Sequence, residues 1–180
     1  MPDMEQAVTF QDPAGHAVSG ILATPPHGSD RLAVLCHGFL SNKNSHTNLA
    51  LTERLLPQSI ATFRFDFFGQ GESEGPFERI TVSLAVSQAL AALDLMHSKS
   101  YRKLALVGSS FGGMVSLLAA AKRPEVSCLA LKCPVPSFPA MLNSEFGSLP
   151  GQASVPKDAP LPVRSPAWRS SAPCRPFRRC

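Results

Sequence analysis

The residues with the clearest chemical potential read GSSFG, at positions 108–112. A serine with a glycine two positions away on each side is typical of a sharp strand-to-helix turn that presents the serine hydroxyl as a nucleophile. The apolar run 104–107 predicts the strand, and the Ala/Leu-rich run after the turn predicts the helix. A Cβ at Gly108 or Gly112 would collide across so tight a turn. We therefore expect Ser110 to be a nucleophile, with a merely structural turn as the alternative.

The helix after this turn would support chemistry at the serine. Its first N–H groups and the positive end of its dipole would point towards any negative charge formed at Ser110. Ser109 is the weaker candidate, because a nucleophile there would place Val107 and Phe111 where the pattern requires glycines.

Two further polar residues directly follow apolar, strand-like runs. His37 follows the run 32–36, and Asp66 follows the next run along the chain. The carboxyl ends of parallel strands share one rim of a sheet, so both residues are expected near Ser110. We interpret His37 as a loop histidine that shapes its turn through its ring nitrogens, and not as a catalytic base. Asp66 is interpreted as a turn anchor, paired with Arg64 or bonded to backbone N–H groups, and not as a catalytic acid.

Hydrophobic periodicity predicts the elements that position these residues. Two alternating segments predict an N-terminal β-hairpin, and repeated strand-helix units follow it. This order predicts an α/β fold with a mostly parallel, doubly wound sheet and helices on both faces. The expected hairpin strands are 4–10 and 16–23, the later strands 32–36, 60–65, 104–107 and 127–131, and the helices 45–56, 81–97 and a third that ends near residue 122.

Length and composition predict one soluble domain with a sizeable core. The 180 residues are 44% hydrophobic with a mean hydropathy of +0.03, and no apolar run is long enough for a membrane span. The N-terminus lacks the pattern of a secretory signal, so we expect a cytoplasmic protein. The five scattered cysteines, Cys128 and Cys133 among them, are expected to be reduced, buried thiols. No metal-ligand spacing or dinucleotide fingerprint is present, so we expect no cofactor.

The positive charge belongs to one end of the chain. Residues 1–147 carry 11 Lys and Arg against 12 Asp and Glu, whereas residues 148–180 carry 6 against 1. The second segment is also rich in Pro, Ser and Arg and has no periodicity. We therefore predict a folded part over 1–147 and a disordered tail over 148–180.

Three motifs in this order, HGF, RFDFFGQGESEG and GSSFGG, resemble the alpha/beta-hydrolase superfamily over about residues 4–140. The sequence is most similar to the serine aminopeptidase-like and cinnamoyl (feruloyl) esterase-like group. The resemblance implies a serine hydrolase that acts on a carboxylic ester or related acyl bond of a small molecule, with Ser110 as nucleophile. It further implies an oxyanion hole formed by the backbone N–H groups of Phe39 and Phe111. Gly108 and Gly112 would be the glycines of the nucleophile elbow.

One departure from the family concerns the rest of the catalytic triad. In this fold the acid and then the histidine follow the serine along the chain. No histidine follows Ser110, and no later acid occupies a convincing position. We expect His16, His27, His46 and His97 to face solvent and not to replace the base. The chain as given is therefore expected to be inactive, with the strand 127–131 as an open sheet edge.

Because the similarity to the family stops before the end of the chain, we expect a damaged or incomplete hydrolase. We expect the hydrolase sequence to end near residues 146–148 and the remainder to be out of frame or unrelated, with a natural linker as the alternative. A non-catalytic fragment or binding module with a basic tail is the alternative function. Only Trp168 and Phe177 accompany the basic residues of the tail, so no nucleic-acid partner is expected. The sequence leaves the oligomeric state open.

Overall fold

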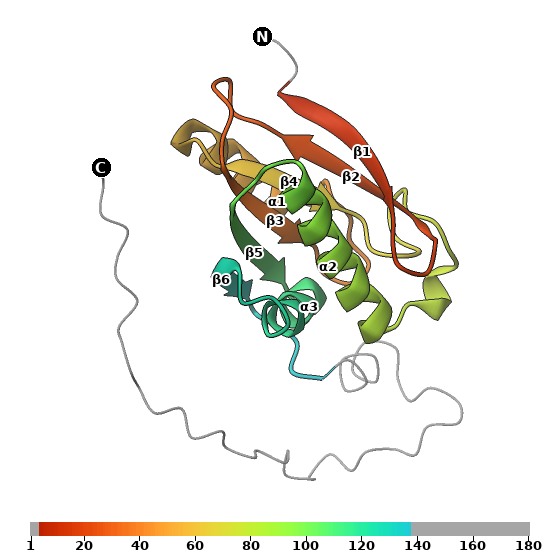
Figure 1. Ribbon diagram of the computed structural model, residues 1–180. Helices are drawn as coiled ribbons and strands as arrows, with labels where there is room; N and C mark the ends of the chain where they lie inside the picture. The colour runs from red at the N-terminus through yellow and green to blue at the C-terminus, as the bar shows by residue number, and fades with distance from the viewer. Residues whose placement is uncertain (1–3, 138–180) are drawn as a thin grey trace, which may run out of the picture.

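Six strands form one mixed β-sheet in the computed structural model, which describes residues 4–137 (Figure 1). The expected tail over 148–180 lies outside these residues. The strands are β1 (Glu5–Gln11), β2 (Ala17–Ala23), β3 (Arg31–Cys36), β4 (Ala61–Phe65), β5 (Lys103–Ser109) and β6 (Val126–Lys132). The helices are α1 (His46–Leu55), α2 (Val82–Ser98) and α3 (Phe111–Ala120), with short 3₁₀ helices η1 (Leu56–Gln58) and η2 (Phe77–Arg79).

The strand order is β1-β2-β4-β3-β5-β6. β1 and β2 form the predicted antiparallel hairpin, and β2 also runs antiparallel to β4. β4, β3, β5 and β6 are mutually parallel. The predicted fold class, a mostly parallel sheet with an N-terminal hairpin, is therefore confirmed.

Side-chain caps start two of the helices where the sequence predicts them. The Ser45 hydroxyl accepts a hydrogen bond from Asn48 N (3.3 Å), and the Thr81 hydroxyl accepts one from Leu84 N (3.1 Å). Such caps satisfy N–H groups that have no partner within the helix. α1 ends at Leu55, and Pro57 lies in the short 3₁₀ helix η1 that follows it.

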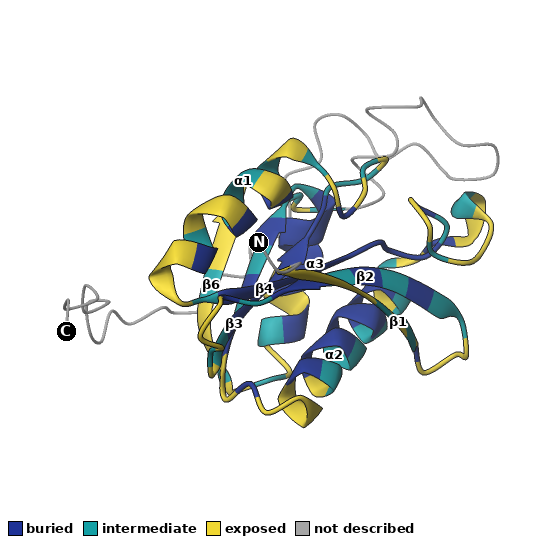
Figure 2. Ribbon diagram, turned by 90° about the horizontal axis from the view of Figure 1, so that it is seen from above, coloured by how far each residue is buried: buried dark blue, intermediate teal, exposed yellow. Residues whose placement is uncertain are grey.

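Helices cover both faces of the sheet, with α1 on one side and α2 and α3 packed together on the other (Figures 1 and 2). The apolar face of α2 is buried in the core at Ala85, Val86, Ala89, Leu93 and Met96, while Val82 at the start of the helix is partly exposed. No helix within residues 4–137 has the length and apolarity that crossing a lipid bilayer requires.

β6 is the last strand of the sheet within residues 4–137. Most of its residues are exposed, as Figure 2 shows in yellow. Cys128 on β6 and Cys133 just after it are both exposed free thiols, whereas Cys36 on β3 is buried. The expectation that the cysteines are buried is therefore correct for Cys36 and wrong for the other two, because no described element covers the outer side of β6.

Candidate active site

The three polar residues that follow strands all lie at the carboxyl edge of the sheet. Cys36 of β3 pairs with Phe65 of β4 and with Gly108 of β5. The loops that begin at His37 and Asp66 and the turn at Ser110 therefore leave the sheet side by side. Open α/β sheets bind ligands beyond this edge.

Ser110 occupies the tip of a tight turn between β5 and α3. Its backbone dihedrals are φ 52° and ψ −116°, a conformation that is unfavourable for any residue with a Cβ. Ser110 N donates to Lys132 O (2.9 Å), and Ser110 O accepts from Gly113 N (3.0 Å) and Val135 N (3.2 Å). These bonds hold the turn between α3 and the segment that follows β6. The Ser110 hydroxyl makes no capping hydrogen bond to its own helix.

Gly108 and Gly112 are sites of close backbone approach. A Cβ on Gly108 would overlap the carbonyl group of Gly112 across the turn. A Cβ on Gly112 would instead overlap the carbonyl groups of Cys36 and His37 at the end of β3. The steric requirement expected from the sequence is present at both positions, but at Gly112 its source is the neighbouring strand and not the turn itself.

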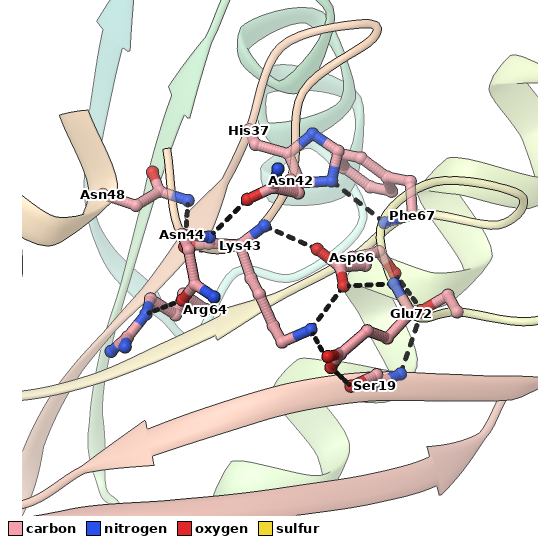
Figure 3. Close-up of polar contacts among 11 residues, drawn as sticks. Ser19, His37, Asn42, Lys43, Asn44, Asn48, Arg64, Asp66, Phe67 and Glu72 are labelled. Carbon is pink, nitrogen blue, oxygen red and sulfur yellow. Dashed lines mark hydrogen bonds and ion pairs between the residues drawn. The ribbon is translucent and has the colours of Figure 1, made fainter. Parts of the chain in front are cut away.

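His37 is buried, and both of its ring nitrogens are engaged. Phe67 N donates to Nε2 (3.1 Å), and Nδ1 lies 2.7 Å from Gly38 O (Figure 3). A backbone N–H can only donate, so Nε2 is the acceptor and Nδ1 carries the proton. Burial lowers the pKa of His37, although its bond to Gly38 and the nearby Asp66 charge oppose this. His37 is therefore a neutral loop histidine, which agrees with its interpretation from the sequence.

Asp66 is a turn anchor whose carboxylate accepts three hydrogen bonds (Figure 3). Oδ1 accepts from Lys43 N (2.5 Å), and Oδ2 accepts from Lys43 Nζ (2.5 Å) and from Glu72 N (2.9 Å). The expected bonds to backbone N–H groups are present. Arg64 does not pair with Asp66: its guanidinium donates to both carboxylate oxygens of Glu5 (3.0 and 2.7 Å).

Lys43, in the polar segment between β3 and α1, is a further residue of this site and has no distinguishing pattern in the sequence. Its side chain is 4% exposed and binds both Asp66 and, at 2.6 Å, Glu72. Burial on its own lowers the pKa of the Lys43 ammonium, but its bonds to the two carboxylates and their charges raise it overall. A lysine inside a polar stretch gives no signal of such burial.

Phe39 and Phe111, the predicted sources of the oxyanion-binding N–H groups, are brought together by the fold. Their ring centroids are 5.7 Å apart, and Phe39 also lies 5.1 Å from Phe77. Gly38, next to Phe39, is so close to the turn that a Cβ there would lie 3.6 Å from the Ser110 Cβ. The rings of Phe67 and Phe111 (5.4 Å) continue this aromatic cluster into the core.

The remaining histidines differ in their surroundings. His27, His46 and His97 are exposed, as expected. His16 is only partly exposed: Nδ1 lies 3.1 Å from Asp12 Oδ2, and its ring packs edge-on against Phe68 at 4.6 Å. The expectation that His16 faces solvent is therefore only partly correct, because the hairpin loop folds onto the loop after β4 and covers part of the ring. Across residues 4–137, no three His, Cys, Asp or Glu side chains are grouped as a metal ion would require.

The sequence model of the alpha/beta hydrolase fold matches residues 33–156, more than half of the 180-residue chain. The chain therefore belongs to the alpha/beta-hydrolase family. The match extends beyond residue 147, and the expected end of the hydrolase part at that position stays a prediction.

Solved structures and curated proteins provide more specific relatives. The structure of Est1E from Butyrivibrio proteoclasticus with ferulic acid bound has a TM-score of 0.72 and 26% identity, and the alignment covers 86% of this chain and 62% of that one. An esterase from Pyrococcus furiosus shares the fold at a TM-score of 0.65 and 21% identity, covering 72% and 49% of the two chains.

The curated relatives are mitochondrial palmitoyl-protein thioesterases ABHD10. The Bos taurus protein is 35% identical and the Mus musculus protein 38% identical, each over 88 residues. These 88 residues are 49% of this chain but only 28% and 29% of the two relatives. Because these relatives are described as mitochondrial, the cytoplasmic location expected from the sequence is not confirmed.

Proposed function

We propose that Ser110 is the acyl nucleophile of an ester or thioester hydrolase, and that the N–H groups of Phe39 and Phe111 bind the oxyanion. The observation that carries this proposal is the backbone of Ser110, held at φ 52° between β5 and α3 with its hydroxyl not used as a helix cap. Strained residues of this kind concentrate at functional sites. The esterases and thioesterases among the relatives support the same class of reaction.

In the proposed reaction, Ser110 Oγ attacks the carbonyl carbon of the substrate and its proton passes to a base. The carbonyl oxygen becomes an oxyanion that accepts hydrogen bonds from the two N–H groups. Collapse of this intermediate breaks the bond to the alcohol or thiol, which takes up the proton, and water later releases the acid from the serine. Removing one oxyanion donor typically costs about 2.7–4 kcal/mol of transition-state stabilisation.

Within residues 4–137, no histidine is an evident base for this reaction. No histidine follows Ser110, and both ring nitrogens of His37 are already engaged. Loss of the base in a serine hydrolase lowers turnover by about 2 × 10⁶. We therefore propose that this chain holds the nucleophile and the oxyanion donors but does not turn over ester substrates unaided.

A pair of aromatic residues, one of them next to the Gly38 that approaches Ser110, favours an apolar acyl group as substrate. Phe39 and Phe77 are both partly exposed and in contact with each other. Flat or extended apolar groups pack well on such rings. The ferulic acid bound to Est1E and the palmitoyl group named for the thioesterases are both consistent with this class.

The proposal is tested by supplying the missing base from solution. Labelling by a fluorophosphonate forms a bond from Ser110 Oγ to phosphorus and expels fluoride, and added imidazole can accept the serine proton. We expect intact-mass spectrometry to show a labelling rate that increases with imidazole concentration. Ser110→Ala should abolish this labelling, and Ser109→Ala, the matched control, should retain it. Labelling that is absent with imidazole, or that persists in Ser110→Ala, would favour a non-catalytic binding module.

A further inference from the structure

The loop over residues 37–45 connects β3 to α1 and carries Phe39. Both ends of the loop are fastened to a single dipeptide at the end of β4. At the near end, Phe67 N donates to the His37 ring (3.1 Å). At the far end, Asp66 accepts hydrogen bonds from both the backbone N and the Nζ of Lys43. Figure 3 shows these two attachments side by side.

The attachment of Lys43 to Asp66 is an ion pair, whereas the attachment of His37 to Phe67 is a hydrogen bond between neutral groups. The Lys43 side chain is 4% exposed and the Asp66 side chain is fully buried. A buried ion pair is screened little by water, and removal of one partner leaves an uncompensated charge. Glu72 binds Lys43 Nζ as well and donates its own N–H to Asp66 (2.9 Å). The Lys43 ammonium is therefore held by the carboxylates of Asp66 and Glu72, and Asp66 is itself held by the Glu72 N–H.

In the middle of the loop, the Phe39 ring packs against Phe111 and Phe77, but the next residue, Leu40, is exposed and in a strained conformation. Leu40 adopts a left-handed conformation (φ 57°) and is 62% exposed. This conformation is uncommon for a residue with a branched side chain, so the loop geometry must be maintained by its attachments at the two ends together with the packing of Phe39. The adjoining part of the loop lies against the serine turn, since a Cβ on Gly38 would be 3.6 Å from the Ser110 Cβ. A shift of the loop would move the Phe39 N–H relative to Ser110.

We propose that Lys43, through its ion pair with Asp66, is a positioning residue that holds the Phe39 N–H in place for the oxyanion formed at Ser110. This inference rests on the proposed function, because it assigns to Lys43 an effect on the chemistry of that site. Lys43 does not touch the reacting atoms and acts only through the loop. A displacement of about 1 Å in a catalytic group can cost about 10²-fold in rate.

The test compares Lys43→Met with Lys103→Met. Lys103 is exposed and forms an ordinary surface ion pair with Asp30 (3.1 Å). We expect Lys43→Met to increase amide hydrogen exchange over residues 38–43 by about tenfold or more. We also expect it to lower the imidazole-assisted fluorophosphonate labelling rate at Ser110 by about 10- to 10²-fold. Lys103→Met should leave both quantities within about twofold of wild type.

A second variant separates loop positioning from loss of folding. The double variant Lys43→Met/Asp66→Asn leaves no unpaired buried charge, and it should still show faster exchange and slower labelling. An effect on stability alone would shift the urea unfolding midpoint without slowing the labelling of folded molecules. Wild-type exchange over 38–43 in both variants would overturn the inference, as would faster exchange with unchanged labelling. If the wild-type chain is not labelled at all, the proposed function is refuted, and with it the effect of Lys43 on the reaction. The exchange measurement would still show whether Lys43 fixes the loop.

Discussion

Replacement of Gly112 by alanine tests the packing of the serine turn against β3. Gly112 is the second residue of α3 and is buried. Its φ is not positive, so alanine is compatible with its backbone conformation. The added Cβ would nevertheless overlap the backbone carbonyl groups of Cys36 and His37. The expected destabilisation therefore comes from this overlap and not from backbone strain.

The size of this effect follows from two opposing contributions. Alanine in place of glycine within a helix gains at most about 0.5–1 kcal/mol. Overpacking typically costs about 1–3 kcal/mol, and more when the neighbours cannot move aside. The neighbours of Gly112 are backbone atoms at the end of β3, a strand paired on both sides. Because these neighbours cannot readily move aside, the cost lies at or above the upper end of its range, and we expect Gly112→Ala to lower the free energy of unfolding by about 2 kcal/mol or more.

Gly113→Ala is the matched control in the same turn of α3. A Cβ at Gly113 would lie 3.1 Å from atoms of Pro134 and 3.2 Å from Gly108 O, so it needs shifts of only a few tenths of an ångström instead of the severe overlap at Gly112. Its unfolding free energy is expected to stay within about 1 kcal/mol of wild type. Urea unfolding followed by far-ultraviolet circular dichroism measures both variants. The steric account fails if Gly112→Ala is as stable as Gly113→Ala.

Two titratable groups lead to further predictions. Burial raises the pKa of the Cys36 thiol to about 12. Iodoacetamide at pH 8 should therefore alkylate the exposed Cys128 and Cys133 in the native protein, and Cys36 only after unfolding in urea. Peptide mass mapping measures the alkylation, and alkylated Cys36 in the native protein would contradict this prediction. Burial lowers the pKa of His37, so below the ordinary value near 6.5 the unfolded state takes up a proton that the folded state does not. The difference in unfolding free energy between wild type and His37→Gln should therefore shrink as the pH falls from 7 to 5, and a constant difference would show that His37 takes up its proton equally in both states.

The arrangement of the strands could be predicted because it depends on local patterns. Alternating residues indicate the hairpin, continuous apolar runs indicate the buried parallel strands, and Ser45 and Thr81 are cap residues at the helix starts. Strand ends then place His37, Asp66 and Ser110 at one edge without further information.

Features that depend on distant partners could not be predicted in the same way. Lys43 contacts Asp66 across 23 residues, and Arg64 contacts Glu5 across 59 residues. The type of a charged residue does not specify which opposite charge it meets, or whether the pair is buried. The exposure of Cys128 was missed for a related reason: an apolar strand reads as buried whether or not an element covers its outer side.

The central claim is that Ser110 carries the acyl group during the reaction. It is tested most directly by incubating the chain with an activated aryl ester and imidazole, followed by peptide mass mapping. The account predicts one acyl group on the peptide that contains Ser110, stable because no histidine assists its hydrolysis, and absent in Ser110→Ala. Acylation confined to cysteine or lysine peptides, or equal in wild type and Ser110→Ala, would contradict it.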